Sequence, residues 1–287
     1  MGNDKIVFVT GATGNQGGAV ARNLHQKGFI VKALTRNTNS PKASILKQLG
    51  IQLVKGDLNN STTYLEHLKG AYGVFSVQTF EEGVKKETRQ GISLATTAKE
   101  LSIQHFVYSS APGADLKTGI PHIESKFVIE NHIRQMSIPF TIIRPGSFYE
   151  NFLIPQVKKG ILKGHLTQPI NRDTVLHYIA ADDIGKAVAR IFCESDLYNG
   201  KTVSLACESL STQEVAETFT RALNREIVYK KLPTLITRLF LGKDLCKMFK
   251  WMDEQTLFIK ENIKDARQEF PDQLSLKSWI TMNFKTS

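Results

Sequence analysis

The stretch FVTGATGNQGGAV, residues 8–20, decides the fold because it sets an apolar run directly against four glycines. Glycine in a helix costs about 1 kcal/mol relative to alanine, so glycines where a helix begins need a compensating reason. Gly11, Gly14 and Gly17 follow the spacing G-x-x-G-x-x-G. The first allows a tight turn, the second lets a diphosphate approach the backbone, and the third lets the helix pack close to the sheet. The stretch therefore predicts a dinucleotide site at a helix N-terminus.

Short apolar runs alternate with longer amphipathic segments along the first half of the chain. The runs rich in Val, Ile and Phe are residues 5–10, 30–35, 52–55, 73–77, 105–109 and 140–143. Strands separated by helix-length segments are typical of right-handed βαβ units, which form a parallel sheet covered on both faces. We therefore expect an α/β fold, a doubly wound parallel sheet of the Rossmann type, over residues 1–150.

The alternation of apolar runs and amphipathic segments becomes irregular after Pro145, which predicts a smaller mixed C-terminal domain over residues 151–287. A strand-and-helix unit follows at 175–192, and residues 175–200 are expected to return to the first domain. Ser211 and Glu214 have the spacing of a capping box and predict the start of another helix. The segment from about residue 233 onward is rich in aromatic residues and is predicted to be helical. We expect this smaller domain to hold a substrate or a partner.

Composition narrows the functional classes. The three cysteines are odd in number and far apart, so the sequence predicts neither a disulfide framework nor a metal site, and a reducing cytoplasm fits best. No run of about 18 apolar residues is present, and the N-terminus lacks a signal-peptide layout, so we expect no membrane association. The net charge of +10 is spread along the chain without a nucleic-acid reading motif. It favours an anionic small ligand over nucleic acid.

The end of the second strand indicates which dinucleotide binds. An acid there would hydrogen-bond the ribose hydroxyls of NAD, whereas this chain has Thr35, Arg36 and Asn37, followed by Lys42. Because a guanidinium offers a planar fork for a 2′-phosphate, we predict NADP(H) as the cofactor. The alternative is that Arg36 is an ordinary surface residue. Asp57, after the third strand, lies where an adenine edge is recognised, or else serves only as a turn residue.

Six motifs together resemble the NmrA-like family of atypical short-chain dehydrogenase/reductase proteins, above all its redox-sensor type. They are FVTGATGNQGGAVARNL, LTRN, KGDLNN, FVYSSAPG, HIESK and IIRPGSFYENFL. The chain is also similar, more distantly, to isoflavone and phenylcoumaran benzylic ether reductases and to bacterial NAD(P)H:quinone reductases. The resemblance covers nearly the whole chain and implies an NADP-binding Rossmann domain with a small C-terminal domain.

The resemblance also implies a set of cofactor contacts, carried over by position. The diphosphate would be held by Gly11, Ala12, Thr13, Gly14, Asn15 and Gln16. The 2′-phosphate would contact Arg36 and Lys42, and the adenine would contact Asp57 and Leu58. Gln78, Thr79 and Phe80 would lie beside the cofactor after the fourth strand, and the nicotinamide end would be lined by Phe148, Tyr149, Glu150 and Asn151.

The catalytic pair of typical short-chain dehydrogenases, Tyr-x-x-x-Lys, is missing, because no tyrosine is followed four residues later by lysine. In those enzymes the lysine binds the nicotinamide ribose and lowers the pKa of the phenol, so that the tyrosine can exchange a proton with substrate. Here His122 has that spacing to Lys126, and Ser109 or Ser110 ends the preceding strand. We therefore take Lys126 and His122 as the catalytic candidates, with Lys126 also binding the cofactor.

Two functions remain open from the sequence. In the first, hydride passes from the nicotinamide to a quinone-like or enone-like small molecule, while Lys126 or His122 handles the proton; an imidazole with an ordinary pKa near 6.5 suits that task. In the second, Lys126 only binds the ribose, His122 is an ordinary helix residue, and the protein senses the NADPH/NADP⁺ ratio for a regulatory protein partner. The oligomeric state is left open, a homodimer included.

Overall fold

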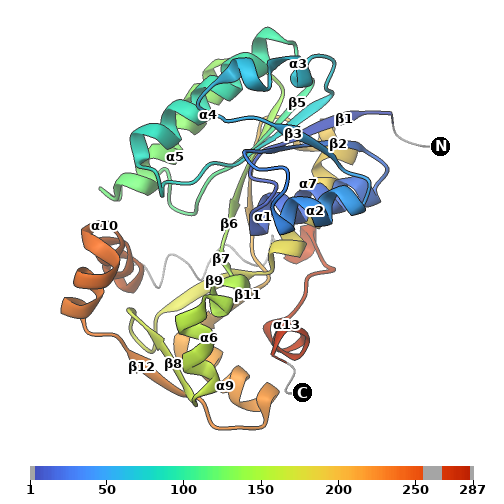
Figure 1. Cartoon of the computed structure of the whole chain (residues 1–287). Coiled ribbons are helices and arrows are strands. Elements are labelled where there is room, and N and C mark those ends of the chain that lie inside the picture. The colour runs from blue at the N-terminus through green and yellow to red at the C-terminus, as the bar shows by residue number, and fades with distance from the viewer. Residues whose placement is uncertain (1–3, 255–266, 285–287) are drawn as a thin grey trace. The chain divides into compact units, whose positions relative to one another are not determined.

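Two compact units make up the chain (Figure 1). The structure, a computed structural model, describes residues 4–254 and 267–284. The first unit comprises Met1–Arg144 and Ile184–Val203, and the second comprises Pro145–Asp183 and Ser204–Ser287. The segment that returns to the first unit thus begins inside a helix, later than the expected residue 175.

A seven-stranded sheet forms the centre of the first unit, in the order β10-β6-β5-β4-β1-β2-β3. β1 pairs in parallel with β2 and β4, β2 with β3, β4 with β5, and β5 with β6. This confirms the predicted doubly wound parallel sheet, and the six expected strands agree with the observed ones to within two residues at each end. The strands are β1 (Ile6–Val9), β2 (Ile30–Thr35), β3 (Gln52–Lys55), β4 (Gly73–Ser76), β5 (His105–Ser109), β6 (Phe140–Pro145) and β10 (Lys201–Leu205).

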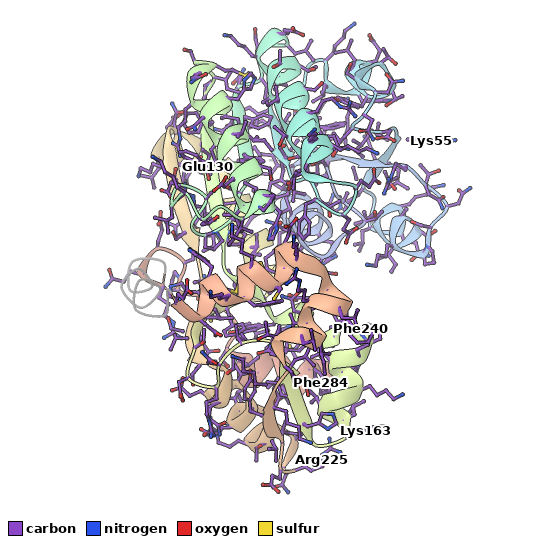
Figure 2. The ribbon with its side chains drawn as sticks, turned by 90° about the vertical axis from the view of Figure 1, so that its left-hand side faces the viewer. Lys55, Glu130, Lys163, Arg225, Phe240 and Phe284 are labelled. Atoms are coloured by element: carbon purple, nitrogen blue, oxygen red, sulfur yellow. The ribbon has the colours of Figure 1, made fainter. Side chains whose placement is uncertain are left out.

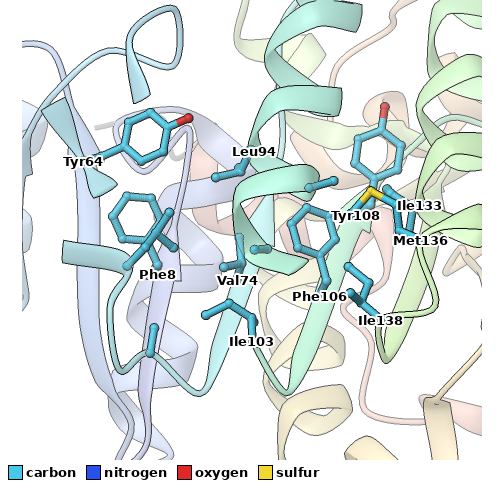
Figure 3. Close-up of a cluster of buried hydrophobic side chains, with 14 of the residues drawn as sticks. Phe8, Tyr64, Val74, Leu94, Ile103, Phe106, Tyr108, Ile133, Met136 and Ile138 are labelled. Carbon is cyan, nitrogen blue, oxygen red and sulfur yellow. The ribbon is translucent and has the colours of Figure 1, made fainter. Parts of the chain in front are cut away.

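Helices cover both faces of this sheet. One face carries α3 (Leu65–Leu68), α4 (Val84–Glu100) and α5 (Pro121–Gln135), which bury a cluster of aliphatic and aromatic side chains against the strands (Figure 3). The other face carries α1 (Asn15–Gln26), α2 (Pro41–Gln48) and α7 (Ala181–Cys193). α7 lies against α1 so closely that a Cβ added at Gly185 would stand 2.7 Å from the carbonyl oxygen of Ala19. The short helix α8 (Ser195–Tyr198) leads into β10.

The second unit has two small sheets. β7 (Ser147–Phe148), β9 (Val175–Ile179) and β11 (Glu208–Ser211) form one, and β8 (His165–Gln168) pairs with β12 (Val228–Lys231) in the other. Its α-helices within the described residues are α6 (Pro155–Leu162), α9 (Thr212–Leu223), α10 (Thr234–Glu254) and α13 (Leu276–Asn283). Gly242, with φ of 84°, interrupts α10.

The predicted capping box is confirmed at the start of α9. The hydroxyl of Ser211 accepts from the backbone N–H of Glu214 at 3.1 Å, and the Glu214 carboxylate accepts from the N–H of Ser211 at 2.7 Å. Two of the donors that a helix N-terminus leaves unpaired are thereby satisfied. The helix then packs Phe219 into the aromatic core of this unit, edge-on to Phe152.

No helix among residues 4–254 and 267–284 is long and apolar enough to cross a membrane. Over the same residues, no group of three or more His, Cys, Asp or Glu side chains could hold a metal ion.

His105 makes the stability of the first unit pH-dependent. It is buried on β5, with its Nε2 2.9 Å from the Thr141 hydroxyl and its ring edge-on to Phe192. Burial lowers its pKa from 6.5 to about 4. Because the folded pKa lies below the unfolded one, the folded state binds fewer protons, and stability is lost as pH falls from about 6.5 towards 4. We expect a loss of roughly 2 kcal/mol between pH 7 and pH 5 from this group.

Urea unfolding at the two pH values measures this loss. His105→Gln removes the titrating group while leaving an amide that can bond to Thr141, so its stability should fall by about 2 kcal/mol less than that of the wild type over this range. An equal fall in both proteins would show that His105 does not carry the effect.

Candidate functional site

The backbone turn between β1 and α1 has the geometry expected from its glycines. Gly11 has a φ of +60°, and the N–H of Gly14 closes the turn on the Gly11 carbonyl at 2.8 Å. A Cβ at Gly17 would stand 2.6 Å from the carbonyl oxygen of Thr10, so only glycine allows α1 to pack this closely. Gly14 is the N-cap of α1 and supplies no side-chain hydrogen bond, and the first turn holds no acid. The first N–H groups of α1 thus suit an anion.

Side-chain hydrogen bonds fix this turn to the neighbouring strands. The Thr10 hydroxyl donates to the Val77 carbonyl at 3.0 Å and accepts from the Val77 N–H at 2.8 Å, which ties the end of β1 to the end of β4. Gln16 donates from Nε2 to the Ser109 hydroxyl at 2.7 Å. The start of α1 and the ends of β4 and β5 therefore form one rigid edge. Ser109, one of the two serines noted at the end of the strand before His122, thus bonds to Gln16.

Arg36 follows β2, and its side chain is 69% exposed. Its guanidinium forms an ion pair with Glu82, 2.6 Å from Nη1 to Oε1, and Lys86 pairs with the other oxygen of the same carboxylate. Glu82 belongs to the loop between β4 and α4. Lys42, the second residue predicted to contact the phosphate, lies exposed in the first turn of α2.

Asp57 forms a local turn at the end of β3. Its Oδ1 accepts from the N–H of Asn59 at 2.9 Å and from the Asn59 amide at 2.7 Å. Its own N–H donates to the Thr63 hydroxyl at 3.0 Å. Asp57 therefore serves as a turn residue, which was the alternative to adenine binding. Leu58 is partly buried and packs against the core.

The loop after β4 brings one predicted residue, Phe80, against α5. The Phe80 ring stacks on the imidazole of His122, with 4.5 Å between centroids and 22° between planes. His122 is buried, and Phe80 is partly exposed. In the same loop Gln78 donates to the Ser76 hydroxyl at 2.8 Å, while its buried Oε1 has no partner among the described residues, and the Thr79 hydroxyl accepts from the Glu81 N–H.

The ammonium group of Lys126 forms an ion pair with Glu87, a residue that was not among the predicted site residues. Its ammonium lies 2.8 Å from Oε1 of Glu87, and the hydroxyl of Ser125 donates to Oε2 of the same carboxylate at 2.7 Å. Glu87 is fully buried on α4, whereas 13% of the Lys126 side chain is exposed. A carboxylate taken fully out of water needs such partners. Glu87 thereby orients Lys126 on α5.

The tyrosine on the strand before α5 does not replace the missing phenol. Tyr108 lies on β5 in the cluster under α4 and α5, where Figure 3 shows its ring beside Ile133 and Met136. Its hydroxyl is buried with no partner among the described residues, and burial raises its pKa well above 10. This side chain belongs to the core.

The four residues predicted for the nicotinamide end lie in the second unit. Tyr149 is fully buried between Tyr178 and Trp279, and its hydroxyl donates to Glu208 at 2.8 Å. Glu150 accepts from the first N–H of α7, that of Ala181, at 3.0 Å, and burial raises its pKa. Phe148 is partly buried and Asn151 is exposed. Their contact with a cofactor stays a prediction.

Two acids complete the candidate site. Glu82 reaches Arg36 across 46 residues of sequence, and Glu87 reaches Lys126 across 39. Glu87 could have been noticed, because it lies on the buried stripe of its helix with Gly91 and Leu94, where a charge is unexpected. Glu82 carries no such signal, since an acid just before a helix is ordinary.

A doubly wound sheet with a bare backbone turn before its first helix defines a protein of the Rossmann type. This chain belongs to the NmrA-like family, whose model matches residues 3–280, and the resemblance seen in the sequence is confirmed. It is 31% identical over 245 residues to an NmrA-like family domain-containing protein of Dictyostelium discoideum, covering 79% of this chain and 80% of that one.

Two further similarities concern proteins with a described role. The NmrA-like family domain-containing oxidoreductase malD of Malbranchea aurantiaca is 30% identical over 258 residues, covering 81% of this chain and 77% of that protein. NmrA, a negative transcriptional regulator, in complex with NADP has a TM-score of 0.79 at 25% identity, covering 97% of this chain and 94% of that one. The same regulator in complex with NAD has a TM-score of 0.81 at 24% identity, with the same coverage.

Proposed function

We propose that the first unit binds NADP(H). The observation that carries this proposal is the turn before α1, where Gly11 at φ +60° and the uncapped helix N-terminus offer backbone N–H groups to a diphosphate. A side chain at Gly17 would displace the helix from this position. Arg36 would bind the 2′-phosphate. The complexes of NmrA with NADP and with NAD support the binding of a nicotinamide dinucleotide.

We further propose that the protein is a reductase that passes hydride from NADPH to a quinone-like or enone-like small molecule. Bound NADPH would supply the hydride. Lys126, oriented by Glu87, would bind the nicotinamide ribose, and the ring of Phe80 stacked on His122 would border the cofactor. A quinone needs little acid help to accept hydride, which suits a site without the Tyr-x-x-x-Lys pair. The oxidoreductase malD supports this reaction class.

Purified protein mixed with NADPH and a panel of quinones and enones tests both proposals. Calorimetry should detect uptake of NADPH, and the absorbance of the reduced nicotinamide should then decrease with at least one acceptor. Protein that takes up neither NADPH nor NADH would contradict the proposed binding. Uptake of NADPH without turnover of any acceptor would contradict the reductase alone.

A second candidate function is a redox sensor that binds a protein partner in a cytoplasmic setting. The first half of α10 favours it, because Leu235, Leu239 and Phe240 expose 80%, 78% and 76% of their surface among the described residues. Apolar side chains grouped on a surface are typical of protein interfaces. In a sensor, NADPH and NADP⁺ would bind with different affinity to two states of the protein. Protease digestion that differs between the two cofactors, in the absence of turnover, would distinguish the sensor from the reductase.

A further inference from the structure

We propose that Glu82 sets the preference of the site between NADP(H) and NAD(H). This inference rests on the proposed function and names a specificity residue for it. The sequence has no acid at the end of β2, the position from which NAD-binding Rossmann proteins bond the ribose hydroxyls. The structure brings a carboxylate to the guanidinium of Arg36, the first residue after β2, from a different segment, the loop between β4 and α4.

The contacts of Glu82 place its carboxylate between two cations. One oxygen lies 2.6 Å from the Arg36 guanidinium, and the other pairs with Lys86 one turn further along. Hydrogen bonds from Lys86 and then from Arg36 lower the pKa of Glu82, so the carboxylate is ionised at neutral pH. The guanidinium of Arg36 is therefore already paired with a carboxylate of the chain itself.

A 2′-phosphate on Arg36 has to replace this carboxylate. Its charge at neutral pH is about −1.5 to −2, as for other phosphate monoesters. Arg36 and Lys86 together supply two positive charges, and Glu82 cancels one of them. NADP(H) binding thus requires that Glu82 leave the guanidinium and still remain in the neighbourhood as a like charge. Both effects weaken binding of the phosphorylated cofactor.

The Glu82 carboxylate has the opposite effect on NAD(H), whose ribose carries a 2′-hydroxyl instead of a phosphate. A carboxylate held by Arg36 accepts a hydrogen bond from the hydroxyl of NAD(H), as an acid at the end of β2 does in other Rossmann proteins. Glu82 therefore favours NAD(H) while Arg36 favours NADP(H). Removal of the Glu82 charge should move the balance towards NADP(H).

Calorimetric titration of the full chain with NADPH and with NADH tests this inference. In Glu82→Gln we expect NADPH to bind about fivefold more tightly, a change of the size that an exposed ion pair supplies. NADH should bind equally or more weakly. Glu81→Gln is the matched control, because it removes the same charge from the neighbouring residue of the loop, and it should leave the ratio of the two affinities within twofold.

A second variant keeps the test specific to the contact with Arg36. In an Arg36→Ala background, Glu82→Gln should increase NADPH affinity by clearly less than it does in the wild type, because the competition for the guanidinium has been removed and only the like-charge effect remains. Equal changes for NADPH and NADH in Glu82→Gln, or no change beyond twofold, would overturn the inference while leaving NADP(H) binding intact. Wild-type protein that binds neither dinucleotide would instead overturn the proposed function.

Discussion

Glu130→Ala is expected to lower the free energy of unfolding by about 3–5 kcal/mol, because it leaves the largely buried guanidinium of Arg144 with only the half-exposed Asp115 as a partner among the described residues. Glu130, labelled in Figure 2, lies on α5 and is fully buried. Its Oε1 accepts from Nε of Arg144 at 3.0 Å, and its Oε2 accepts from Nη2 of Arg144 at 2.8 Å. Arg134 adds a third hydrogen bond at 3.1 Å. Arg144, only 12% exposed on β6, depends on this carboxylate.

Urea unfolding measures the effect, and Asp115→Ala provides a matched control. Asp115 also pairs with Arg144, at 2.9 Å, but its side chain is 48% exposed. Its removal should therefore cost less than about 1 kcal/mol. The double variant Glu130→Leu with Arg144→Met should recover much of the loss, because both charges are gone. A loss below 1 kcal/mol in Glu130→Ala would show that the pair does not stabilise the first unit.

In the proposed reductase, Lys126→Ala should reduce turnover of the quinone by about 100-fold or more, the usual contribution of a positioned catalytic group. The same change leaves the fully buried Glu87 with Ser125 as its one remaining side-chain partner among residues 4–254 and 267–284. We therefore also expect a loss of roughly 3 kcal/mol in the free energy of unfolding. Lost activity in this variant could thus come from lost structure.

A double variant separates the two effects. Glu87→Gln with Lys126→Met removes both charges while keeping an amide that can bond to Ser125, so stability should return to within about 1 kcal/mol of the wild type. Turnover should stay low, because no ammonium remains for the ribose. Stopped-flow absorbance of NADPH and urea unfolding give the two readouts. Turnover near the wild-type level in the stable double variant would remove Lys126 from the catalytic site.

Much of the fold could be predicted because its signals are local. Six of the seven strands follow from short apolar runs, and each connection between these six contains a helix, so the βαβ rule gives the parallel sheet without knowledge of distant contacts. β10, with the sequence KTVSL, was not among the expected strands. Gly17 and the capping box at Ser211 are likewise short-range patterns. The division into units was harder to place, because the chain returns to the first unit at Ile184, within the continuous helix α7.

The site was only partly predictable because its charges meet through tertiary structure. No spacing in the sequence relates Glu82 to Arg36 or Glu87 to Lys126. The loop before α4 brings Glu82 to Arg36 at the end of β2, and the first turn of α4 brings Glu87 to Lys126 on α5. Asp57 is the opposite case, because its contacts are local and could be predicted. They form an Asx turn that needs no ligand to explain it.

The interrupted first unit has a consequence for how the chain is synthesised. Its sheet needs β10, at Lys201–Leu205, and one of its faces needs α7, whose Phe192 packs on Phe29 and His105. A nascent polypeptide must therefore extend past about residue 203 from the ribosome before this core can close. A fragment ending near residue 150 would leave an open sheet edge and an uncovered apolar face, and such surfaces promote aggregation.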